Sequence, residues 1–162
     1  MTGVRELTTY LNDHLAASAG GLALAERARD AQRDEDPELA RLLAGVTEDI
    51  RADKQQLERA MRAVGAPINP LKPLAGKVGE LVGRLKLNGR LLGRARLSTL
   101  LELEGLTIAV QGKRALWLAL GELDDPRLRQ VDLGRLVERA EDQYSRLEGA
   151  RRRAARAVLA DR

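Results

Sequence analysis

Polar side chains interrupt the apolar stripes of this sequence at a few positions. A binding or catalytic site, if the chain has one, is expected to be built from these inward-facing residues. A buried ion needs a partner of opposite charge, because removing that partner costs about 3–5 kcal/mol. Carboxylates that face inward between helices are also the usual ligands of metal centres in helical bundles. The residues that we single out as a candidate site are Ser18, Asp53, Glu104, Arg114, Glu141, Tyr144 and Arg151.

One interpretation of these residues is a structural polar network. Arg114 or Arg151 would balance the charges of Asp53 and Glu104, with Tyr144 as a hydrogen-bond donor. The polar side of the helix that carries Glu104 and Arg114 would otherwise simply face solvent. We favour these structural interpretations, since ion pairs often perturb charged groups without serving a function.

The other interpretation is a working or relic metal site. Asp53, Glu104 and Glu141 would then supply carboxylate oxygens, which suit a hard cation. Such a site would lack imidazole ligands, and an inward-pointing arginine would place positive charge where the metal would sit. We therefore expect no bound cofactor and no catalytic residue.

Composition removes several classes of site. The chain has no cysteine, which excludes a thiolate nucleophile, an iron–sulfur cluster and a cysteine zinc site. Aromatic residues make up only 2%, which argues against a base-stacking platform for single-stranded nucleic acid. His14 is the only histidine, so no site can draw two imidazoles from one chain. His14 could be a lone ligand or a proton shuttle, but nothing pairs it with a nucleophile, and we expect a structural role.

The elements that must position these residues are helices. The chain has 162 residues, 44% of them apolar, which is enough for a single domain over residues 1–162. Apolar residues recur at spacings of three and four, the helical period. This pattern predicts an all-α protein with long helices over about 4–31, 37–64, 98–120 and 133–160.

Local signals mark where these helices begin and end. Asp36, followed by a proline, is an N-cap for the second helix, and Gly65 suits the left-handed position at its end. Asp125-Pro126 predicts a turn or a short helix. Asp132 can cap the last helix, whose predicted apolar face includes Tyr144 and Arg151.

The connection over residues 66–96 differs from the others in length and charge. Residues 70–96 hold seven cationic side chains and one glutamate, although the whole chain has a net charge of only +4. An apolar stripe there predicts a short helix, with glycines on its opposite face. We expect this segment to cap one end or side of the bundle. The glycines would allow close contact with a neighbour, and the simplest neighbour is a second copy of the chain in a homo-oligomer. Alternatives are an anionic membrane surface or phosphate backbones bound without sequence specificity, through Lys72, Lys77, Arg84, Lys86 and Arg90.

One long connection between two helical pairs is the ferritin-like four-helix topology. Short stretches of the sequence also resemble the ferritin-like superfamily, and locally the bacterioferritins. They are Leu11-Asn12-Asp13-His14-Leu15 for the first helix, Arg51-Ala52-Asp53-Lys54 for the second and Arg139-Ala140-Glu141-Asp142-Gln143-Tyr144 for the last. Tyr10 to Leu15 and Gly112 to Trp117 further resemble a group of bacterial ferritin-like proteins of uncharacterised function.

The resemblance implies a di-iron centre, and the sequence departs from it in the first helix and in both Glu-x-x-His motifs, whereas the third helix could still supply Glu104. The first-helix glutamate falls on Ser18, and the last Glu-x-x-His becomes Glu141-x-x-Tyr144. The second Glu-x-x-His becomes either Glu48-x-x-Arg51 or, in the register of the apolar stripe, Ile50-x-x-Asp53. We therefore expect the fold without a functional di-iron centre.

These observations favour a non-catalytic structural or interaction module over an enzyme. The alternatives are a carboxylate-only metal-binding or iron-handling protein, and a binder of anionic surfaces through residues 70–96. No signal peptide and no apolar run of about 18 residues is evident, which predicts a cytoplasmic protein.

Overall fold

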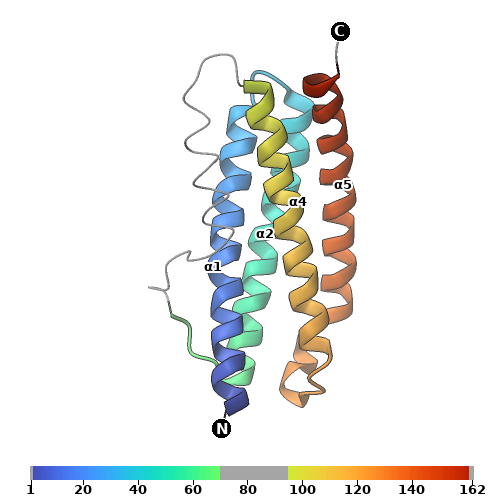
Figure 1. Cartoon of the computed structure of the whole chain (residues 1–162). Helices are drawn as coiled ribbons and strands as arrows, with labels where there is room; N and C mark the ends of the chain where they lie inside the picture. Colours follow the sequence, from blue (N-terminus) through green and yellow to red (C-terminus); the bar gives the residue numbers. More distant parts are fainter. Residues whose placement is uncertain (1, 70–94, 161–162) are drawn as a thin grey trace.

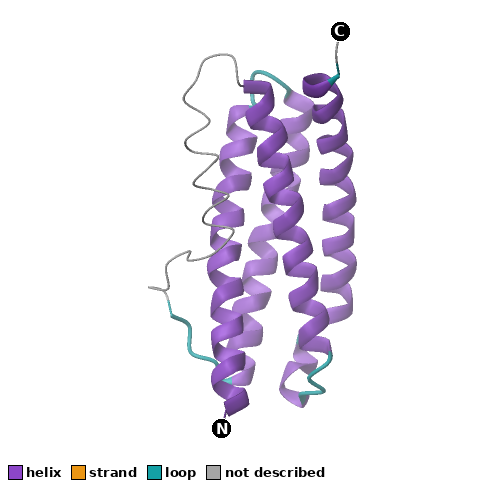
Figure 2. Cartoon of the chain, in the orientation of Figure 1, coloured by secondary structure: helices purple, strands orange, loops and turns teal. Residues whose placement is uncertain are grey.

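Four long α-helices make up the computed structural model, which describes residues 2–69 and 95–160. Within those ranges there is no β-strand, so the predicted all-α fold class is confirmed (Figures 1 and 2). No helix in this part of the chain is both long and apolar enough to cross a membrane. The helices are α1 (Thr2–Ala31), α2 (Pro37–Val64), α4 (Ala95–Gly121) and α5 (Leu133–Leu159), with a 3-10 helix η1 (Pro126–Gln130) before α5.

The directions of the helices follow from contacts at the two ends of the bundle. At one end, Gln32 after α1 donates a hydrogen bond of 3.0 Å to Thr99 near the start of α4. At the other end, Arg127 after α4 donates one of 3.0 Å to the carbonyl of Val64, the last residue of α2. The helices α2 and α4 therefore run in the same direction, as Figure 1 shows, and a tight turn cannot join them. The predicted short helix within residues 66–96 lies outside the described residues.

The helix ends confirm the predictions made from local signals. Asp36 Oδ1 accepts a hydrogen bond of 3.0 Å from the backbone nitrogen of Leu39 at the start of α2. Gly65 ends that helix with φ 72°, a left-handed conformation that glycine adopts without steric cost. Asp132 caps α5 in the same way as Asp36 caps α2. The first and third helices begin a few residues earlier than expected, at Thr2 and Ala95.

The apolar core consists of two clusters along the bundle axis. One contains Leu43, Val46, Ile50, Leu103, Leu106, Val110 and Leu147, and the other Leu11, Leu57, Met61, Leu116, Trp117, Leu120 and Leu136. Along α2, Asp53 falls between Ile50 of the first cluster and Leu57 of the second. Along α4, Lys113 falls in the same way between Val110 and Leu116, so a polar layer interrupts the core where these two helices face the centre.

The predicted apolar face of α5 is partly wrong. The prediction placed Tyr144 and Arg151 near the centre of that face, yet both are only half-buried. The structure instead buries Gln143 completely and leaves Ala150 only 3% exposed. Successive residues of a helix differ by 100° in direction, so the true face is turned by one residue from the predicted one. This rotation brings Gln143 into the polar layer.

Candidate functional site

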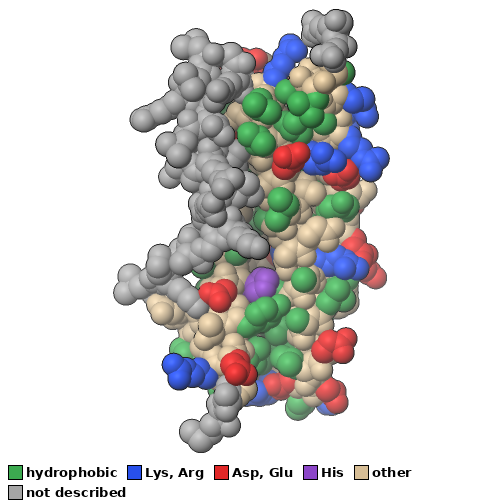
Figure 3. All heavy atoms as spheres, in the orientation of Figure 1, with side chains coloured by type: hydrophobic (Ala, Val, Ile, Leu, Met, Phe, Trp, Pro, Cys, Tyr) green, Lys and Arg blue, Asp and Glu red, His purple; other side chains and the backbone are tan. Residues whose placement is uncertain are grey.

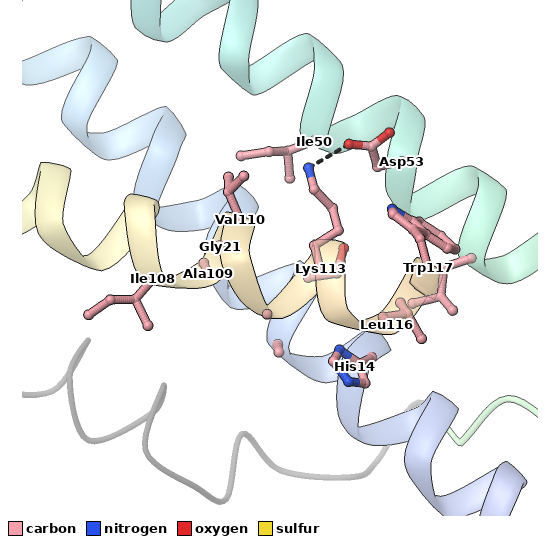
Figure 4. A pocket seen from close by; sticks show the side chains of 14 residues that line it. His14, Gly21, Ile50, Asp53, Ile108, Ala109, Val110, Lys113, Leu116 and Trp117 are labelled. Carbon is pink, nitrogen blue, oxygen red and sulfur yellow. Dashed lines mark hydrogen bonds and ion pairs between the residues drawn. The ribbon is translucent and has the colours of Figure 1, made fainter. Parts of the chain in front are cut away.

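Asp53 is the centre of a buried polar cluster that joins three helices. Its carboxylate is on α2, and the residue is 2% exposed. Lys113 of α4 places its Nζ 2.5 Å from Asp53 Oδ2 (Figure 4), and the guanidinium of Arg139 on α5 forms an ion pair with Oδ1. Gln143, also on α5, donates from Nε2 to Oδ2 at 3.0 Å, and its Oε1 accepts a hydrogen bond from Lys113 Nζ.

The electrostatics of this cluster are dominated by two cations that share one buried carboxylate. Burial lowers the pKa of Lys113 below its ordinary value, and the nearby Asp53 opposes that shift. Arg139 adds a second positive charge, which further disfavours the charged form of Lys113. Each oxygen of the Asp53 carboxylate has a cationic partner, Lys113 of α4 or Arg139 of α5. The cluster therefore ties α2 to both of these helices.

The structure does not gather the predicted carboxylates. Glu104 lies half-exposed with one oxygen 3.7 Å from Arg151, and Glu141 is exposed, 2.8 Å from a guanidinium nitrogen of Arg114. Asp53 is paired with neither of these arginines. Among residues 2–69 and 95–160, no three carboxylate or histidine side chains come together as a metal site would require.

The di-iron centre that the resemblance implies does not fit the residues present. Of the carboxylates expected at the position of the centre, only Asp53 is buried, and cations take both of its oxygens. Tyr144 packs against the apolar cluster that contains Leu147, and Ser18 lines a cavity, described below, whose wall also includes Asp53 and Lys113.

Arg151 lies 3.7 Å from Glu104, which is one of the pairings considered above, and has a closer partner in Glu148. Its guanidinium forms two hydrogen bonds with Glu148, of 2.7 Å from Nε and 2.8 Å from a terminal nitrogen. Arg152 also pairs with Glu148, at 2.8 Å. These two arginines lower the pKa of Glu148 to about 2. The group is a surface feature near the end of α5 and has no contact with Asp53 that the structure records.

Sequence reasoning missed three members of the buried cluster, Lys113, Arg139 and Gln143. Lys113 shares a helical stripe with Val110 and Trp117, and Gln143 shares one with Ala140 and Leu147. Those spacings are the signal that could have found them. Arg139 carries no such signal, because its long side chain reaches the carboxylate from a position beside the apolar face.

A second buried charge lies nearer the start of α4. Glu102 is 7% exposed, and Arg27 of α1 donates to its Oε1 at 3.2 Å. Burial raises the pKa of Glu102, and the Arg27 charge and hydrogen bond work in the opposite direction. This pair joins α1 to α4 just as the Asp53 cluster joins α2 to α4 and α5.

The single histidine lies on α1 at the edge of a cavity. His14 is half-buried, and its ring centroid is 4.6 Å from that of Tyr10 in an edge-on arrangement. Burial lowers the pKa of His14, and the neighbouring Asp13 partly offsets this shift. The imidazole is therefore neutral at physiological pH.

The cavity itself has a volume of about 200 Å³ and lies among α1, α2 and α4 (Figure 4). Its walls are mainly apolar, and His14, Ser18, Asp53 and Lys113 contribute the polar groups. On the face seen in Figure 3, exposed hydrophobic side chains gather among charged ones. Ile108, which is 59% exposed, belongs both to the protein surface and to the cavity wall.

Comparison of the chain with protein-family models, with curated proteins and with solved structures finds no match. The functional assignment therefore depends on the geometry of the buried cluster and of the cavity. The predicted basic residues Lys72, Lys77, Arg84, Lys86 and Arg90 lie outside the described residues.

Proposed function

We propose that this protein is a non-catalytic, ferritin-like helical bundle in which an ion-pair cluster stands where related bundles hold two metal ions. Its role is that of a structural or interaction module. The observation that carries the proposal is the pairing of the Asp53 carboxylate with Lys113 and Arg139. A metal ion would have to displace both cations and would be repelled by them. The free-energy cost of this displacement and repulsion exceeds what binding to a few carboxylate oxygens would contribute.

The directions of the helices support the ferritin-like part of the proposal. A bundle of this kind needs its second and third long helices to run in parallel, and α2 and α4 do so (Figure 1). In the simplest four-helix bundle, consecutive helices alternate in direction. The described helices do not alternate, because α2 and α4 run the same way. We further propose a cytoplasmic location and assembly of the chain with copies of itself.

A carboxylate-only metal site is the weaker alternative. It would need Asp53, Glu104 and Glu141 within a few ångströms of one point. Glu104 and Glu141 instead pair with Arg151 and Arg114 near the surface. Binding to an anionic surface through residues 70–96 has no support from the described residues and stays a prediction.

Metal analysis combined with two matched variants tests the proposal. The chain, purified without chelators and offered Fe²⁺ or Mn²⁺, should retain less than one equivalent after gel filtration. Asp53→Asn should lower the midpoint of thermal unfolding strongly, whereas Glu141→Gln should leave it nearly unchanged. Two metal ions per chain that are lost in Asp53→Asn would overturn the proposal, and light scattering on the same samples measures self-association.

A further inference from the structure

A second, polar cleft of about 310 Å³ lies between α2 and α5, beside η1. Three arginines line it. Arg59 comes from α2, and Arg135 and Arg139 come from successive turns of α5. The other polar residues of its wall are two glutamines and one carboxylate, namely Gln56, Gln130 and Asp132. Since three cations face a single carboxylate, the wall of this cleft carries an excess of positive charge.

Two of these arginines have no counter-charge of their own. The side chains of Arg59 and Arg135 are exposed and form no ion pair or hydrogen bond with the residues that the structure describes. Asp132 is engaged elsewhere, because its Oδ1 caps α5 by accepting the backbone N–H of Arg135 at 3.0 Å. Arg135 and Arg139 are four residues apart on one helix face, where like charges repel each other. An anion in the cleft would relieve this repulsion.

Arg139 connects the cleft to the buried polar cluster. Its guanidinium pairs with Asp53 Oδ1, yet its side chain is 29% exposed and lines the cleft. A guanidinium has five N–H donors, so a single carboxylate does not use all of them. The positive end of α5, which begins at Leu133, lies beside the same cleft and adds to the attraction for an anion.

The chemistry and size of the cleft restrict which anion could enter. Guanidinium groups suit phosphate, because their planar fork of N–H donors binds two phosphate oxygens at once. The volume of the cleft is near the roughly 300 Å³ lower end of the range for small-molecule sites. Glu58 directly precedes Arg59, and Glu138 directly precedes Arg139, so the positive charge does not continue along either helix. A nucleic-acid strand, whose phosphates repeat, would need a longer basic track.

We propose that this cleft binds a small phosphate monoester. Arg59 of α2 and Arg135 of α5 would hold the phosphate oxygens from opposite helices, and Arg139 would contribute from the inner end of the cleft. The amide of Gln56 would be available to a hydroxyl group on the rest of the molecule. The proposal adds a ligand to the structural role of the Asp53 cluster and does not depend on the ferritin-like assignment.

Glycerol 3-phosphate is the probe for this site. It is titrated by calorimetry into the full-length chain, in a low-salt buffer that is free of phosphate and sulfate. We expect saturable binding of one equivalent, with an affinity that falls as salt is added, because salt screens the charges of an open cleft. Inorganic phosphate should compete for the same site, whereas glycerol, which lacks the charge, should not bind.

Matched arginine variants separate the cleft from the net charge of the chain. Arg59→Gln and Arg135→Gln should each weaken binding of glycerol 3-phosphate by at least about tenfold, as the loss of a hydrogen bond to a charged group does. Arg62→Gln on α2 and Arg153→Gln on α5 remove the same charge outside the cleft and should bind as the unmodified chain does. All four side chains are exposed, so circular dichroism should show four folded proteins.

Three outcomes would overturn the proposal. One is that glycerol 3-phosphate at millimolar concentration gives no saturable binding. Another is that the cleft variants and the control variants lose the same affinity, which would indicate a response to net charge alone. The third is that a short single-stranded oligonucleotide binds much more tightly than glycerol 3-phosphate and loses its affinity in Arg59→Gln, which would assign the cleft to nucleic acid instead.

Discussion

Lys113 Nζ lies 2.5 Å from Asp53 Oδ2 and so links α4 to α2 across the centre of the bundle. The two helices run in parallel, and this contact sits between the two apolar clusters of the core. The ion pair therefore interrupts the apolar core at its middle, and in the proposed ferritin-like bundle this is the place where inward-facing carboxylates would bind metal. Its removal should affect stability more than any surface ion pair does.

Replacement of the buried carboxylate should destabilise the fold strongly. Asp53→Ala leaves Lys113 and Arg139 without their counter-charge, and we expect the free energy of unfolding to fall by about 3–5 kcal/mol. Urea denaturation followed by circular dichroism measures the change. Glu141→Ala, which breaks an exposed pair with Arg114, is the control and should cost about 0.2–1 kcal/mol. Equal losses in the two variants would contradict the central role of Asp53.

Removal of both members of the pair should be milder than removal of one. The double variant Asp53→Leu with Lys113→Met exchanges two buried ions for apolar side chains, a change that is often neutral in proteins. We expect it to recover most of the loss seen in the Asp53→Leu single variant, since Arg139 is 29% exposed at its side chain and can reach water. A double-mutant cycle measures the coupling. Simple additivity of the two single losses would show that the residues act independently.

The single histidine should titrate below its ordinary pKa of 6.5. Burial lowers the pKa of His14 in the folded protein, so the unfolded chain takes up the proton first as the pH falls. Stability is then complete above about pH 6.5 and declines as the pH falls through the folded pKa. NMR titration of the imidazole gives that value directly. Asp13→Asn should lower it further, because the Asp13 charge acts to raise it; an increase would contradict this account.

Acid should weaken the surface cluster at the end of α5. Arg151 and Arg152 lower the pKa of Glu148 from 4.5 to about 2, so its contribution is fully present above 4.5 and is lost as the pH falls toward 2. The thermal midpoint of the unmodified protein should exceed that of Glu148→Gln by a constant amount above that range. The difference should shrink at lower pH. A difference that is independent of pH across the whole range would show that the carboxylate charge is not its source.

Much of the fold could be predicted because its signals are local. The caps at Asp36 and Asp132 and the left-handed Gly65 act within a few residues of themselves, so sequence alone located the helix ends. The apolar stripe of α2 was equally clear, with polar Asp53 within it. For α5 two overlapping stripes were available, one through Tyr144 and one through Gln143. Only the position of the other helices decides which of them faces the core.

The sequence by itself determined that this chain forms helices of these lengths, that Asp53 lies on a core-facing stripe and that two imidazoles cannot meet in one site. Tertiary structure alone decided which cations bind Asp53, since Lys113 and Arg139 are 60 and 86 positions away along the chain. It also decided that a cavity lies among α1, α2 and α4, and that the buried Trp117 N–H has no hydrogen-bond partner among the described residues. The physical reason is that capping and periodicity act within one helix, whereas charge pairing and packing depend on how whole helices are turned toward one another.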